Sequence, residues 1–107
     1  MITAGAKCNK AKDGGTTPMH WAALHGHEAV VKELIEGGAE VNKARDDGLT
    51  PLSWAAWKGH DAVVKALIEA GADINKTDND GKRPLRLAAS KGHDAVAQLL
   101  RDAGAEH

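Results

Sequence analysis

Three histidines that recur at one fixed interval are the first candidates for chemistry in this chain. His27, His60 and His93 are each 33 residues apart, and His25 stands two residues before the first of them. Imidazole nitrogens bind zinc at about 2 Å, whereas neighbouring packed helices lie about 10 Å apart. Equivalent histidines of stacked units therefore cannot share one ion without distortion. We predict no metal site and no cofactor, and we expect each imidazole to hydrogen-bond to a neighbouring loop.

The acidic and glycine-rich segments carry no recognisable catalytic or ligand-binding motif. Asp46-Asp47 and Asp78-Asn79-Asp80 supply oxygen ligands, but the calcium loop with its terminal Glu is missing. Gly14-Gly15 follows no predicted strand and lacks the Lys-Ser/Thr pair of a phosphate-binding loop. No serine or cysteine nucleophile sits in a recognisable elbow. We therefore expect a protein that is not an enzyme.

Composition argues against several classes of partner. The chain has 107 residues, with 14 basic and 15 acidic side chains and a net charge of -1, so it has no basic surplus for nucleic acid. No apolar run approaches the roughly 20 residues of a membrane span, and residues 1–7 lack the apolar stretch of a signal peptide. The single cysteine, Cys8, fits a reducing compartment. We expect an intracellular, cytoplasmic protein or a recombinant product that binds neither nucleic acid nor membrane.

The elements that position these residues recur with the same interval. Thr17-Pro18 opens a short predicted helix, because Thr caps a helix N-terminus and Pro suits the first turn. Gly26 ends this helix in the left-handed conformation. A second helix over 28–36 has a helical rather than an alternating apolar pattern. The same signals return around Pro51 and Pro84, and the links between the units carry hairpin-turn residues.

The repeated motif resembles the ankyrin repeat. The resemblance implies a mainly α fold, which is a solenoid of stacked helix-turn-helix units with β-hairpin loops. It divides the single domain 1–107 into a partial repeat (1–12), two repeats (13–45 and 46–78) and a C-terminal capping repeat (79–107). The residues that carry the resemblance are Thr17-Pro18-Met19-His20-Trp21-Ala22-Ala23, then Gly26-His27 and Gly38-Ala39-Glu40-Val41-Asn42, with the equivalents Thr50-Pro51-Leu52-Ser53-Trp54-Ala55-Ala56 and Arg83-Pro84-Leu85-Arg86-Leu87-Ala88-Ala89.

Departures from the motif distinguish the three units. Ser53 replaces the His of the motif, and Arg83 and Arg86 replace its Thr and His, so the Thr–His hydrogen bond of the family is expected only in the first unit. The polar substitutions of the third unit suit the end of a stack. At the other end, residues 1–12 alone cover the first full unit, which predicts a monomer or weak self-association through this N-terminal face. The side chains expected to be partly exposed there are Met19, Val30, Leu34 and Ile35.

Partner binding is the function that the resemblance implies. Ankyrin domains usually bind proteins with their hairpin tips and with the concave face of the first helices. These positions differ between the units while their surroundings do not, which fits a uniform scaffold with a variable surface. The alternative is a structural spacer or an engineered stability scaffold without a dedicated partner. The residues expected to contact a protein partner are Asp13, Thr16, Leu24, His25, Asp46, Asp47, Leu49, Trp57, Lys58, Asn79, Asp80, Lys82, Ser90 and Lys91.

The three tryptophans are expected to have different roles. Trp57 aligns with Leu24 in the first unit and with a serine in the third, so the scaffold does not require an aromatic side chain there. A binding module should show a contiguous apolar patch of Trp57, Leu24 and Leu49. The alternative for Trp57 is a ring that folds over its own helix. Trp21 and Trp54 occupy a motif position, which predicts a core or helix-packing role.

Two asparagines are candidates for modification. Asn42 and Asn75 end the strings Glu40-Val41-Asn42 and Asp73-Ile74-Asn75, each with a leucine eight residues upstream. This pattern resembles the sequence favoured by the oxygen-dependent asparaginyl hydroxylase that modifies ankyrin domains. The other interpretation is structural, since Asn readily bridges the backbone of a turn. Cys8 is equivalent to Val41 and is expected to be a small apolar filler.

Overall fold

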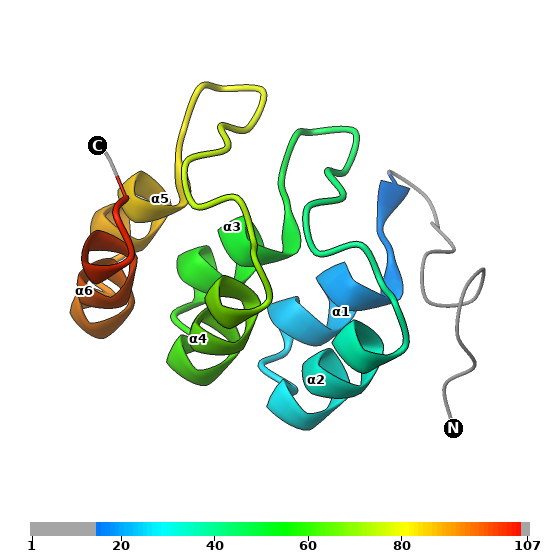
Figure 1. The fold of residues 1–107 in the computed structure, drawn as a ribbon. Coiled ribbons are helices and arrows are strands. Elements are labelled where there is room, and N and C mark those ends of the chain that lie inside the picture. Colours follow the sequence, from blue (N-terminus) through cyan, green and yellow to red (C-terminus); the bar gives the residue numbers. More distant parts are fainter. Residues whose placement is uncertain (1–14, 106–107) are drawn as a thin grey trace.

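The computed structural model describes residues 15–105. These residues form six helices, which lie as three pairs side by side (Figure 1). No residue in this range is in a strand. The mainly α architecture of stacked helix pairs is therefore confirmed. The helices are α1 (Pro18–Leu24), α2 (Glu28–Glu36), α3 (Pro51–Lys58), α4 (Asp61–Glu69), α5 (Pro84–Ser90) and α6 (Asp94–Asp102).

Threonine caps the first helix in two of the three units. The Thr17 hydroxyl oxygen accepts the N–H of His20 at 3.3 Å, and the Thr50 oxygen accepts that of Ser53 at 3.2 Å. Such caps satisfy backbone N–H groups that a helix start leaves without a partner. The His20 ring also contacts Thr17, with Nδ1 at 2.8 Å from Oγ1. The Thr–His bond predicted for the first unit is thus confirmed, whereas Arg83 makes no side-chain cap in the third.

A glycine in the left-handed region follows the first helix of each unit. Gly26, Gly59 and Gly92 have φ of 71°, 77° and 75°, which residues with a Cβ seldom adopt. The chain then turns back, so that the N–H of His27 donates to the carbonyl oxygen of Ala22 at 2.9 Å. This tight reversal brings the second helix of each unit against the first.

Small aliphatic side chains fill the space between the helix pairs. The first helices contact one another in the order α1, α3, α5, and the second helices in the order α2, α4, α6. One continuous core thus runs through all three pairs and fixes the spacing of the side chains on its surface. Its most deeply buried members are Met19, Ala23, Val31, Leu34, Leu52, Ala55, Ala56, Val63, Val64, Leu67, Leu85, Ala88, Val96 and Leu100.

The side chains expected to be exposed at the N-terminal end fall into two groups. Met19 and Leu34 are only 0% and 1% exposed, so the prediction was wrong for both. They belong to the core cluster between the helices, where burial depends on the whole of α1 and α2. Val30 is 39% exposed and Ile35 is half-buried, as predicted.

The links between the units project from one side of the stack as tight turns (Figure 1). The N–H of Arg45 donates to the carbonyl oxygen of Leu49 at 2.9 Å, and the N–H of Asp78 donates to that of Lys82 at 2.9 Å. Each link folds back as a hairpin does, without a regular strand in the described residues. These bonds hold the loop tips in a fixed shape above the first helices.

Candidate functional site

An open groove of about 580 Å³ lies where α1 ends beside α3. Leucine and tryptophan side chains give it apolar surface, and imidazole and ammonium groups give it polar surface. This mixture is typical of surfaces that bind a polypeptide, where aromatic anchors lie within a polar rim. The lining residues are Leu24, His25, Trp54, Trp57, Lys58 and His60.

Two lysines flank the ring of Trp57. The Nζ atoms of Lys58 and Lys91 each lie 5.0 Å from the centroid of the ring, within the range of cation–π attraction. Lys58 is the last residue of α3, whereas Lys91 follows α5 in the next unit. Trp57 is half-buried and both lysines are exposed. The half-buried indole therefore keeps part of its apolar surface accessible, with two positive charges close to its ring.

Trp54 and Trp21 occupy equivalent positions in different surroundings. Trp54 is partly buried, because the guanidinium of Arg45 lies 4.1 Å from its ring centroid and the His20 ring meets it edge-on at 6.0 Å. The helix-packing role predicted for Trp54 is confirmed. Trp21 is 59% exposed, so the same prediction was wrong for Trp21. Trp54 packs against the preceding unit, whereas no described unit precedes α1.

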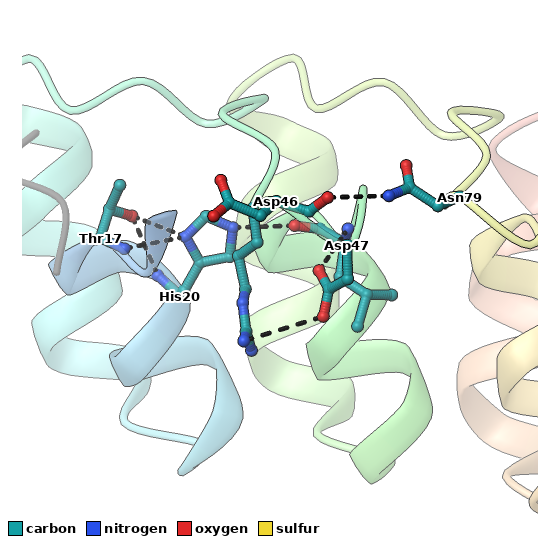
Figure 2. Close-up of polar contacts among 7 residues, drawn as sticks. Thr17, His20, Asp46, Asp47 and Asn79 are labelled. Carbon is teal, nitrogen blue, oxygen red and sulfur yellow. Dashed lines mark hydrogen bonds and ion pairs between the residues drawn. The ribbon is translucent and has the colours of Figure 1, made fainter. Parts of the chain in front are cut away.

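Asn79 joins the tips of two neighbouring loops. Its side-chain amide donates to the carbonyl oxygen of Asp46 at 2.7 Å, and its backbone N–H donates to that of Asp47 at 3.0 Å (Figure 2). A Cβ on Gly48 would lie 2.6 Å from the Asn79 nitrogen, so this approach requires glycine. Asn79 therefore has a scaffold role, and its contact with a partner stays a prediction.

Asp47 orders its own loop. Its Oδ1 accepts the N–H of Leu49 at 3.1 Å, and its Oδ2 lies 3.7 Å from Nη2 of Arg45 (Figure 2). The Leu49 carbonyl oxygen lies 3.0 Å from Nε2 of His20. A chain of polar contacts thus runs from Thr17, at the start of α1, to the loop before α3. It fixes this loop relative to both helices.

His20 is buried in its neutral form. The N–H of Thr17 points at Nδ1 at 3.1 Å, so Nδ1 is the acceptor and Nε2 carries the hydrogen donated to Leu49. Burial lowers the pKa of His20 from its usual value of 6.5, although the Leu49 carbonyl acts in the opposite direction. Ser53, at the equivalent position of the second unit, contacts only Thr50 in this way, at 3.1 Å.

The recurring histidines connect one unit to the next, as predicted. Nε2 of His60 lies 2.9 Å from the carbonyl oxygen of Leu24, and Nε2 of His93 lies 3.0 Å from that of Trp57. Each imidazole therefore donates to a carbonyl at the end of a first helix, where the helix itself supplies no partner. The bond between His60 and Leu24 also fixes two sides of the groove relative to each other.

Metal-binding clusters and membrane-spanning helices are both absent between residues 15 and 105. No group of three or more His, Cys, Asp or Glu side chains in this range is placed to hold a metal ion. No helix in the same range has the length and apolar character needed to cross a bilayer. His25 and His27 instead form a stacked pair of rings with centroids 5.9 Å apart.

The predicted partner-contact residues fall into separate groups. Leu49 does not line the groove, because it precedes the start of α3 whereas the groove lies near its end, so only part of the predicted apolar patch comes together. Asp13 lies outside the described residues. The residues found in or beside the groove are Leu24, His25, Trp57, Lys58 and Lys91. Those found elsewhere, all exposed except the half-buried Thr16, are Thr16, Asp46, Asp47, Asn79, Asp80, Lys82 and Ser90.

Asn42 forms a contact between units. Its Oδ1 accepts the N–H of Asp73 at 2.6 Å, so the structural interpretation of this asparagine is confirmed. It also lines a second depression, of about 630 Å³, together with Lys43 and Lys76. Hydroxylation of Asn42 and Asn75 stays a prediction.

Sequence reasoning missed three residues that shape the groove. Trp54 and His60 line it, and Arg45 covers the Trp54 ring. Arg45 aligns with Asp78 in the next unit. Trp57 was singled out because its position differs between the units, and the same criterion would also have identified Arg45. Trp54 and His60 occupy motif positions and carry no such signal.

The comparison with protein families agrees with this architecture. A family model described as ankyrin repeats, in three copies, matches residues 1–78 and again residues 45–107. Repeats of this family generally mediate protein–protein interaction and are typically not enzymes. No curated protein matches the chain. Because the family matches span the whole sequence and the helix pairs stack at the interval of the repeat, the chain belongs to the ankyrin repeat family.

Proposed function

We propose that the chain is a protein–protein interaction module whose groove holds a segment of a partner protein. The observation that supports this best is the groove itself, in which Leu24, Trp54 and Trp57 offer apolar surface beside cationic groups. Large aromatic side chains contribute most strongly to binding when they fill a pocket at the centre of an interface. Trp57 is the residue best placed for this part, because the repeat does not require an aromatic there.

The charges around the groove favour an acidic partner segment. Lys58 and Lys91 flank Trp57, and Lys58 also lines the groove. Within residues 15–105 neither lysine forms an ion pair with a carboxylate. Carboxylates of a partner would gain two cationic contacts without displacing an existing pair. We infer that the partner presents an apolar side chain flanked by Asp or Glu.

The rigidity of the groove lowers the entropy lost on binding. Its walls come from α1 and α3, which pack through the continuous core. The bond from His60 to the carbonyl oxygen of Leu24 fixes the groove at its end. A surface that is ordered before the partner arrives loses little conformational freedom, so more of the contact energy appears as affinity.

Two peptide libraries test this proposal. Both present the same apolar residue, flanked by Asp and Glu in one library and by Lys and Arg in the other, and binding is measured by calorimetry and indole fluorescence. We expect the acidic library alone to yield ligands, and Trp57→Ala to weaken their binding by about 30-fold, the effect of an anchor worth about 2 kcal/mol. Trp21→Phe is the matched control, since Trp21 lies outside the groove and phenylalanine keeps an aromatic ring against His25, whose ring centroid is 4.2 Å from that of Trp21.

Charge reversal tests the contribution of the lysines separately from that of the apolar side chains in the groove. Lys91→Glu should weaken binding of the acidic peptides, and Lys65→Glu, on the exposed side of α4, should leave it unchanged. Acidic peptides that bind the Trp57→Ala and Lys91→Glu variants as tightly as the unaltered protein would contradict the proposal. If neither library yields a ligand, the alternative is favoured, which is a structural spacer or an engineered scaffold without a dedicated partner. Such a scaffold needs only the contacts that hold its own units together.

A further inference from the structure

The N-terminal end of the stack exposes side chains that are buried elsewhere in it. Val30 is 39% exposed, whereas the equivalent Val63 and Val96 are 0% and 1% exposed. Trp21 is 59% exposed, whereas the equivalent Leu87 is 8% exposed. These positions are covered in the second and third units because another unit precedes them. The outer side of α1 and α2 is therefore a repeat-packing surface without a described repeat upon it.

The opposite end has the complementary property. Ala89 on α5 is exposed, whereas the equivalent Ala23 and Ala56 are both 0% exposed. Arg86 is likewise exposed, at the position where Ser53 is fully buried. These positions are covered in the earlier units because another unit follows them. The outer side of α5 and α6 is the surface that would receive a following unit.

The junctions inside the stack show how these two surfaces fit together. A histidine ring of the later unit lies over a glycine of the earlier one, so closely that a Cβ on this glycine would be 2.6 Å from Nδ1 of the ring. The same ring donates from Nε2 to a carbonyl oxygen of the earlier unit. The two junctions of this kind consist of His60 with Gly26 and Leu24, and of His93 with Gly59 and Trp57.

Each end of the stack carries one half of such a junction. At the C-terminal end, Gly92 has the same conformation, with φ of 75°, but nothing lies within 4 Å of a Cβ placed there. The carbonyl of Ser90 stands where those of Leu24 and Trp57 accept their bonds. At the N-terminal end, the ring of His27 is exposed.

We propose that a second copy of this chain docks head to tail, so that His27 of one copy lies over Gly92 of the other and donates to the Ser90 carbonyl oxygen. This contact continues the packing surface already used between the units. The residues His27, Ser90 and Gly92 do not line the groove, so variants of His27 and Gly92 test this contact separately from the proposed partner binding. Because the two surfaces differ, the contact is heterologous and adds copies in an open row rather than closing a symmetric dimer.

A second pair of residues supports this pairing. Trp54, the equivalent of Trp21, packs against His20 of the preceding unit and lies 4.1 Å from the guanidinium of Arg45. Arg86 is the equivalent of His20 in the third unit. In the docked pair, Arg86 of one copy therefore meets the exposed Trp21 of the next, and a guanidinium over an indole is a favourable contact.

Sedimentation velocity over a wide range of protein concentration tests the proposal. We expect association to increase with concentration and to weaken at least about tenfold in His27→Ala, in Arg86→Glu and in Gly92→Asn. Asn tolerates the left-handed region, and its side chain would fill the site above residue 92. Gly71→Asn is the matched control, because Gly71 has φ of 91° and open space around it, away from both ends.

Mixing two variants distinguishes a head-to-tail contact from any other. His27→Ala retains the surface around Gly92, and Gly92→Asn retains His27, so the two together should form pairs at concentrations where each alone is monomeric. Circular dichroism and unfolding midpoints confirm that each variant is folded. The proposal is overturned if the unaltered protein stays monomeric at every concentration, or if the mixed variants form no pairs. Association of His27→Ala alone at the strength of the unaltered protein would overturn it equally.

Discussion

The middle unit and the N-terminal end of the stack contain the same residue in different surroundings. Val63 on α4 is fully buried, whereas Val30, at the same place on α2, is 39% exposed. Helix α4 packs against both α2 and α6, while α2 contacts only α4 among the described second helices. Burial in this fold therefore depends on the neighbouring unit as much as on the helix that carries the side chain.

Glycine substitutions should give the largest contrast between a covered and an uncovered unit. Gly59 and Gly92 share the left-handed conformation, but only Gly59 has the ring of His93 above it. A Cβ strains the backbone at both positions, at about 1 kcal/mol or more. In Gly59→Ala it also displaces His93 from the carbonyl of Trp57. We expect Gly59→Ala to lower the free energy of unfolding by about 2 kcal/mol more than Gly92→Ala does.

Urea denaturation at low protein concentration, where the chain is monomeric, measures this difference. Equal losses in the two variants would mean that the ring above Gly59 adds nothing to stability, and that backbone strain alone decides both values.

Truncation of Val30 and Val63 measures how much a neighbouring unit adds to the burial of a second helix. Val63→Ala removes fully buried methyl groups and should lower the free energy of unfolding by about 2 kcal/mol, whereas Val30→Ala should lower it by less than about 1 kcal/mol. Both residues lie on second helices in nearly identical sequence, so helix propensity cancels between them. Thermal and urea unfolding supply the values. A loss at Val30 as large as that at Val63 would show that the N-terminal face is covered in solution.

A smaller effect should separate the first unit from the second as the pH falls. His20 is buried where the second unit has Ser53, and burial lowers the pKa of His20. The unfolded chain therefore binds a proton more readily than the folded one, so the contribution of His20 is present above the unfolded pKa of about 6.5 and is lost as the pH falls below it. The charge of Arg45 also lowers the pKa of His20 and the charge of Asp47 raises it, but the net shift is downward.

We expect the urea midpoint to fall as the pH drops from about 7.5 to about 5.5, and to fall less in His20→Ser. The serine has a precedent in Ser53, whose hydroxyl lies 3.1 Å from that of Thr50. Equal slopes for the two proteins would assign the pH dependence to other groups.

The sequence predicts the helices well because their signals are local. Thr17-Pro18 and Gly26 delimit α1 to within one residue of the prediction, and the predicted second helix over 28–36 coincides with α2. The bond of the later histidines to a neighbouring loop also follows from the repeat, because every junction has the same geometry. A helix boundary or a contact between units that is predicted for one repeat can therefore be predicted for the others.

The groove was only partly predictable, because it depends on which units lie next to each other. Trp21 and Trp54 have the same local sequence, yet only Trp54 has a preceding unit to cover it. The expected fold places Leu49 near Trp57 and Leu24, but Leu49 precedes the start of α3 and the groove lies near the end of that helix. Arg45 over Trp54 is a contact that a motif read one unit at a time does not contain.

The imidazole bonds also decide how order is lost from this stack. The carbonyl oxygen of Trp57 at the end of α3 is satisfied by His93, which belongs to the third unit. When that unit frays, α3 loses the group that completes its last turn, and the bond from His60 to Leu24 is the next to be weakened. We therefore expect loss of the third unit to destabilise the junction before it as well. These bonds add to the core contacts between neighbouring units, on which the stability of such a repeat stack depends.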